Sequence, residues 1–190
     1  MADRDAFTER GRSFEEDYFR KKDRELIEKM RRAAAEDEAH SALGREAGTS
    51  DPELLRELRE LGFTPETVRL LPLLPVLQVA WAEGGVSRAE RDLLVGLARA
   101  RGVAEGSAAD QQLSEWLATA PSEGVFQRGT RLIRAMLEST EVAADLSAED
   151  LVGYCEQIAA ASGGILGIGR VSAEERALIE RIAGEVKRQG

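Results

Sequence analysis

The sequence VSRAERDLL occupies residues 86–94, and a close copy, VSAEERALI, occupies residues 171–179. Both copies hold serine and glutamate at the i,i+3 spacing of a capping box, which marks the first turn of a helix. A segment rich in small residues and ending in Gly-Gly lies before each copy, at residues 78–85 and 157–164, with the insertion ILGIGR in the second. Each unit is therefore predicted to be a helix, a glycine turn and a second helix.

The rest of residues 49–190 contains the start and stop signals of short amphipathic helices. Helix caps followed by proline occur at Asp51-Pro52 and Thr64-Pro65, and a looser capping box joins Ser147 and Asp150. Gly62 and Gly102 are expected to end helices. Apolar residues recur at helical spacing, and no stretch sustains strand alternation. We expect an all-α fold, with about seven or eight helices in residues 51–188 forming one bundle with an internal helix-turn-helix repeat.

Residues 9–32 differ from this bundle, because most of their positions are charged and few are apolar. Such a segment cannot build a core of its own. Acids precede bases at i,i+4, and a capping box starts at Ser13, so a charged helix is predicted over residues 13–40. Two of these pairs are Glu25–Lys29 and Glu28–Arg32. Gly44 and Gly48 are expected to end the helix, which gives two domains, residues 1–48 and 49–190.

The composition excludes several classes of function. The chain has 190 residues, with 26 Lys and Arg against 35 Asp and Glu, and its net charge of −9 disfavours a nucleic-acid-coating role. One cysteine and one histidine exclude an internal disulfide and a His-pair zinc site. The longest apolar run, residues 70–79, is interrupted by two prolines and is too short to span a bilayer. Without an apolar targeting segment at residues 1–5, we expect a cytoplasmic protein with no membrane insertion.

Three further motifs are not expected to carry chemistry. The glycine-rich residues 163–169 follow a predicted helix, whereas a dinucleotide site needs a preceding strand. Glu83 and Glu90 supply too few oxygens for a calcium loop, so Glu90 is interpreted as a capping residue. Cys155 is expected to be a small buried hydrophobe, distant in sequence from the single histidine, His40. We therefore expect no enzyme, and no catalytic, cofactor-binding or metal-binding residue.

One narrow apolar stripe crosses the charged helix, formed by Phe14, Tyr18, Leu26 and Met30. A helix without its own core should place such a stripe in a groove or against a partner helix. The alternatives are a homodimeric coiled coil, which Lys22 in the stripe weakens, and docking onto the chain's own bundle. Acids interleave the basic residues of this helix, so we interpret them as a solvated face and not as a nucleic-acid site.

The sequence AFTERGRSFEEDYFR at residues 6–20 resembles the inhibitory segment of the mitochondrial ATPase inhibitor protein family. The resemblance rests on Ala6, Phe7, Arg10, Glu15, Glu16, Tyr18, Phe19 and Arg20, and continues loosely through Glu25, Ile27 and Met30. It implies a helix that enters the catalytic interface between the α and β subunits of the F-type ATP synthase, touches the rotor and blocks ATP hydrolysis.

The resemblance also implies roles for single residues. Tyr18 and Phe19 would be aromatic anchors, and Glu15 and Glu16 would pair with basic groups of the catalytic subunit. Charge-assisted contacts would come from Arg20 and Glu25. The family's glycine-rich start and histidine-rich dimerising helix are not matched, so its pH control and antiparallel dimer are not implied.

Residues 65–188 resemble the tellurite-resistance TerB-like helical domain through the repeated starts GGVSxxE and GRVSxxE. That resemblance implies an adaptor or regulatory role in stress-response or membrane-associated assemblies. We therefore expect a regulatory protein whose N-terminal helix inhibits the F-type ATP synthase, with a bundle for positioning or sensing. The alternative is a TerB-like scaffold whose N-terminal helix mediates self-association into a homo-oligomer. The expected partner-binding residues are Phe14, Glu15, Glu16, Tyr18, Phe19, Arg20, Glu25, Leu26 and Met30.

Overall fold

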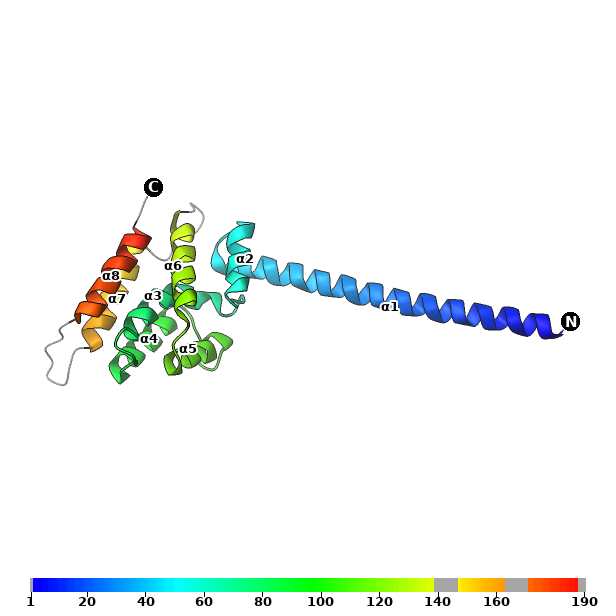
Figure 1. Cartoon of the computed structure of the whole chain (residues 1–190), viewed down its shortest axis with the longest axis horizontal. Helices are drawn as coiled ribbons and strands as arrows, with labels where there is room; N and C mark the ends of the chain where they lie inside the picture. Colours follow the sequence, from blue (N-terminus) through cyan, green and yellow to red (C-terminus); the bar gives the residue numbers. More distant parts are fainter. Residues whose placement is uncertain (1, 139–146, 163–170, 188–190) are drawn as a thin grey trace. The chain divides into compact units, whose positions relative to one another are not determined.

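The computed structural model describes residues 2–138, 147–162 and 171–187, with side chains from Arg20 onward except Ser162. Within these ranges the chain forms eight α-helices, one 3₁₀ helix and no strand, so the all-α prediction is confirmed. In order, the elements are α1 (Ala2–Ala47), α2 (Pro52–Glu60), the 3₁₀ helix η1 (Val68–Leu73), α3 (Leu74–Ala80), α4 (Arg88–Ala100), α5 (Ala108–Ala118), α6 (Glu123–Glu138), α7 (Ala148–Ser162) and α8 (Ala173–Val186) (Figure 1).

The first helix is longer than predicted at both ends. It begins at Ala2 and not at Ser13, and it passes through Gly44 to end at Ala47. No proline interrupts this span, and an interior glycine costs a helix only about 1 kcal/mol relative to alanine. Gly48 ends the helix instead, because its φ of 68° lies in the left-handed region that glycine adopts readily.

The chain divides into two compact units, residues 1–41 and 42–190. We refer to them as the N-terminal unit and the bundle. The division falls before the expected boundary at residue 48, because Leu43 and Ala47 at the end of α1 are buried in the bundle core. The last turns of α1 are therefore a structural part of the bundle.

The centre of the bundle is the apolar run that η1 and α3 share. Pro72 lies inside η1 and Pro75 lies in the first turn of α3, so the prolines divide the run into a 3₁₀ segment and a short α-helix. The predicted α-helix start at Thr64-Pro65 is wrong. These residues form a turn, in which the Thr67 N–H donates to the Thr64 carbonyl at 3.1 Å. All seven residues of α3 are buried, and α4, α6, α7 and α8 pack around them.

The predicted internal repeat is confirmed by two capping boxes in the same geometry. The Ser87 N–H donates to the Glu90 carboxylate at 2.7 Å, and the Ser172 N–H donates to the Glu175 carboxylate at 2.7 Å. Both glutamates are almost fully buried, with exposed fractions of 2 % and 1 %. The first helices of the two repeat copies, α3 and α7, pack against each other. Helices α7 and α8 lie side by side (Figure 1). The predicted turn at Gly163-Gly164 lies outside the described residues.

The outer helices are joined to this centre by specific contacts. The Asp51 carboxylate accepts from the Glu53 N–H at 2.8 Å and caps α2, as the sequence predicts. The Trp81 indole N–H donates to the Trp116 carbonyl at 2.9 Å and ties α5 to the end of α3. Of the helices in the described ranges, none has the length and apolar character needed to cross a bilayer.

Candidate partner-binding surface

The described part of the N-terminal unit carries three exposed large apolar side chains. The exposed fractions of Leu26, Ile27 and Met30 are 56 %, 47 % and 64 %. Residues 26 and 30 are one turn apart on α1 and residue 27 is their neighbour, so the three form one apolar patch. We call Leu26, Ile27 and Met30 the α1 patch. Among the described residues, the other large apolar side chains are at least partly buried in the bundle.

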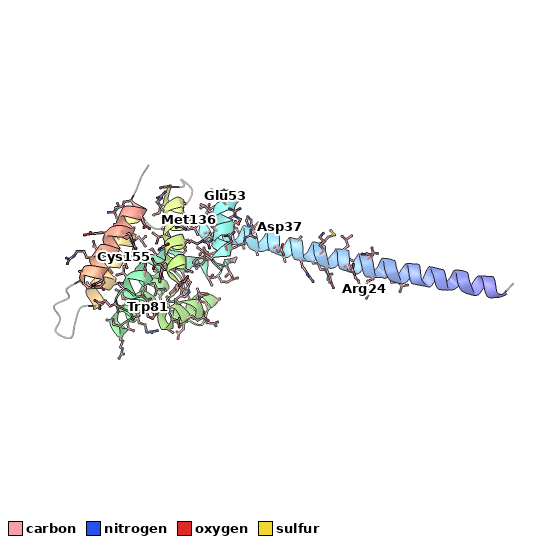
Figure 2. All side chains as sticks on the ribbon, viewed as in Figure 1. Arg24, Asp37, Glu53, Trp81, Met136 and Cys155 are labelled. Carbon is pink, nitrogen blue, oxygen red and sulfur yellow. The ribbon has the colours of Figure 1, made fainter. Side chains whose placement is uncertain are left out.

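Charged side chains surround the α1 patch. Lys22 and Glu25 form an ion pair at 3.5 Å, and the Arg24 guanidinium donates to the Arg20 carbonyl at 3.2 Å. Figure 2 shows Arg24 and Asp37 projecting from α1. An apolar patch ringed by charge suits a recognition helix, in which apolar anchors supply affinity and the surrounding charges set the orientation.

Two of the predicted intrahelical ion pairs do not form. Glu25 and Lys29, and Glu28 and Arg32, make no ion pair in the structure, and Glu25 instead pairs with Lys22. Exposed pairs of this kind are worth only about 0.3–0.5 kcal/mol, so holding two long side chains in one geometry nearly cancels the gain. Lys29 and Arg32 therefore make no ion pair among the described residues.

The predicted partner-binding residues are described to different extents. Arg20, Glu25, Leu26 and Met30 are exposed on α1. The side chains of Phe14, Glu15, Glu16, Tyr18 and Phe19 lie outside the described residues, although their backbone belongs to α1. Sequence reasoning left Ile27 out of the expected site, although it lies beside Leu26 and is also exposed. Its position next to Leu26 in an otherwise charged run was the available signal.

Two of the three motifs that were set aside for chemistry have structural roles, and the third, residues 163–169, lies outside the described residues. Glu90 serves its capping box, and Cys155 is fully buried in α7, as predicted (Figure 2). Burial in apolar surroundings, with a smaller contribution from Glu156, raises the pKa of the Cys155 thiol from 9.0 to about 12. A thiol with that pKa stays protonated at neutral pH and is a poor nucleophile. Within the described ranges, no three His, Cys, Asp or Glu residues gather as metal ligands.

A second surface feature was missed by sequence reasoning. A cleft of about 250 Å³ lies between α3, α6 and α8. Its lining residues are Gln78, Gln127, Thr130, Arg131, Arg134, Arg181, Ile182 and Glu185. The signal in the sequence was Gln78, the single polar residue in the apolar helix LPVLQVA, whose place in a cleft depends on how three separate helices meet.

Comparison of the chain with protein-family models, with curated protein sequences and with solved structures finds no match.

Proposed function

We propose that this protein is a regulator whose N-terminal helix binds the catalytic subunits of an F-type ATP synthase in the cytoplasm and inhibits ATP hydrolysis. In this proposal the bundle is a TerB-like domain that positions the helix or senses a signal, and the chain performs no catalysis itself. The observation that carries the proposal is the exposure of Leu26, Ile27 and Met30 on the helix whose preceding residues resemble an ATPase-inhibitor segment.

The energetics of α1 support insertion into a partner. Full burial of one leucine, isoleucine or methionine side chain contributes roughly 1.5–3 kcal/mol, so the α1 patch alone offers a substantial driving force. The α1 helix is far longer than the ~12–15 residues below which isolated helices are marginal, so little folding entropy remains to be lost on binding. Tyr18 and Phe19 would add aromatic anchors at the leading end of the same helix.

Charge would then fix the orientation of the inserted helix. Glu15 and Glu16 would meet basic groups on the catalytic subunit, while Arg20 and Glu25 would make charge-assisted hydrogen bonds farther along. A helix held in this way in the catalytic interface would block ATP hydrolysis.

The test measures ATP hydrolysis by F-type ATPase membranes from the source cells with the full-length chain added in excess. We expect inhibition that saturates with the chain. Leu26→Ala combined with Met30→Ala should weaken inhibition about tenfold or more, because two buried anchors are lost. Tyr18→Ala combined with Phe19→Ala should relieve it as well.

Glu28→Ala is the matched control for these variants. Glu28 is exposed on the same helix and, two residues from both Leu26 and Met30, points away from them. This variant should inhibit as the unchanged chain does. Undiminished hydrolysis with excess chain, or equal loss of inhibition in Glu28→Ala, contradicts the proposal.

The second candidate is a TerB-like stress-response scaffold in which α1 pairs with α1 of another copy. The same exposed α1 patch favours it, because apolar residues on a long charged helix are also what a helical dimer buries. Removal of residues 1–41 should then convert a dimer to a monomer in light scattering. The deletion must stop at Ser41, because Leu43 and Ala47 belong to the bundle core. An unchanged mass contradicts self-association through α1.

A further inference from the structure

The cleft between α3, α6 and α8 concentrates positive charge on a chain whose net charge is −9. Arg131 and Arg134 line it from α6, and Arg181 lines it from α8, against one carboxylate, Glu185. The α6 lining residues lie at i, i+3, i+4 and i+7, so they share one helix face toward the cleft. The three helices pack against one another in every pairing, so the lining residues are held on a rigid frame.

The floor of the cleft contains a polar group without a partner. Gln78 lies on α3, has an exposed fraction of 8 %, and its amide makes no hydrogen bond within the part of the chain that the structure describes. The amide is not among the enclosed polar atoms that lack a partner, so its N–H₂ and carbonyl are open to the space of the cleft. Every other residue of α3 is apolar, and therefore packing does not explain a glutamine there. The amide N–H₂ and carbonyl are available to a group that enters the cleft.

The arginines of the cleft make few ion pairs, and these are weak. Arg131 has no ion-pair partner among the described residues. Arg134 pairs with Glu138 one turn along α6 at 3.2 Å, and Arg181 approaches Glu123 at 4.0 Å. These pairs are exposed and therefore weak, so a ligand with a higher charge density displaces or shares them at little cost.

We propose that this cleft binds the phosphate group of a small phosphorylated molecule or free inorganic phosphate. Guanidinium groups match phosphate oxygens with two parallel hydrogen bonds, and Arg131 supplies a positive charge that makes no ion pair among the described residues. The Gln78 amide would donate to a phosphate oxygen that the arginines do not reach. A cleft of about 250 Å³ holds a phosphate and leaves space for a small attached group. This site is independent of α1 and of the proposed inhibition.

The test titrates the full-length protein with inorganic phosphate and, separately, with glycerol phosphate, at constant ionic strength kept with sodium chloride. Thermal unfolding and the NMR signals of the side-chain amides report binding. We expect a saturable rise in Tm and a saturable shift of the Gln78 amide signals with at least one of the two compounds. Tighter binding of glycerol phosphate identifies a phosphomonoester as the ligand, and equal or tighter binding of inorganic phosphate identifies free phosphate.

Arg131→Gln should weaken binding about tenfold to a hundredfold, because it removes a charge-assisted bond. Arg176→Gln is the matched control, since Arg176 is exposed on α8, carries the same charge and does not line the cleft. Its affinity for phosphate should be unchanged. Equal weakening in both variants would show a general charge effect and overturn the proposal, as would failure of both compounds to bind.

Gln78→Leu separates a ligand-binding role from a structural one. Replacing the unpartnered amide by an apolar group should raise Tm in the absence of phosphate and reduce the phosphate-induced rise. A lower Tm together with an unchanged response to phosphate overturns the assignment of Gln78 to the ligand.

Discussion

Residues 20–41 and the bundle are both helical, but they differ in what their apolar side chains contact. In the bundle, leucine and isoleucine side chains from every helix share one core. Between residues 20 and 41, Leu26, Ile27 and Met30 are exposed and the helix depends on its own backbone hydrogen bonds. The difference teaches that secondary structure alone does not mark a folded unit, because burial of apolar side chains separates the core of a domain from an exposed helix face.

The largest expected difference between the two regions is in the response to truncation of a leucine. Leu74→Ala at the centre of the bundle should lower the free energy of unfolding by about 2–5 kcal/mol, because it leaves a cavity in a fully buried site. Leu26→Ala should change it by no more than about 0.5 kcal/mol. Urea unfolding followed by circular dichroism measures both. A comparable loss in the two variants would mean that α1 is packed in solution.

Two glycines in helices of the bundle sharpen the comparison between packed and open positions. A Cβ at Gly129 in α6 would collide with the Leu74 side chain, so Gly129→Ala should destabilise the bundle by about 1–3 kcal/mol. Gly96 in α4 has no atom near its Cβ position, and Gly96→Ala should stabilise by about 0.5–1 kcal/mol. Thermal unfolding of the two variants should shift Tm in opposite directions, and shifts of the same sign would contradict the packing described.

The two copies of the repeat allow a comparison inside the bundle. Ser87→Ala and Ser172→Ala each remove one capping hydrogen bond in the same geometry, and each should cost about 0.5–2 kcal/mol. Similar losses in chemical denaturation are expected. If only one variant is destabilised, the repeat is symmetric in geometry and not in energy.

The smallest effect on the free energy of unfolding at neutral pH is expected from the ionisation of Cys155. Because burial raises its pKa from 9.0 to about 12, the unfolded chain loses this proton before the folded chain does. Stability should therefore fall as pH rises from about 9 toward 12, and Cys155→Ala should remove that part of the slope. At pH 8 the folded protein should not react with a thiol reagent until it is unfolded. Rapid reaction of the folded protein would contradict the burial of Cys155.

Much of the bundle could be predicted from local signals. Capping boxes, cap-plus-proline pairs and glycine stops act within one turn, so the starts at Ser87 and Ser172 and the stops at Gly62 and Gly102 are confirmed. The predicted helix starts were wrong where local signals compete. Ser13 resembles a helix start, but the helix continues through it because nothing upstream ends it. Thr64-Pro65 resembles a start too, but a turn forms there, and the following residues form a 3₁₀ segment in which Pro72 has no N–H for an α-helical hydrogen bond.

The candidate sites were predictable to different extents. The α1 patch depends on residues close together in sequence, so helical spacing was enough to find Leu26 and Met30. The cleft joins residues from α3, α6 and α8 that are far apart in sequence, and only tertiary packing brings Gln78 near Arg131 and Arg181. No local rule contains that information.

The close approach of Gly129 to Leu74 has a consequence for how this sequence can diverge. The Leu74 side chain fills the space that any Cβ at position 129 would need. A larger residue at 129 requires the Leu74 side chain to shift or to be replaced by a smaller one, so homologous chains with a larger residue at 129 should tend to have a smaller residue at 74. Coordinated substitution at 74 and 129 would thus be an evolutionary signature of the contact between α3 and α6.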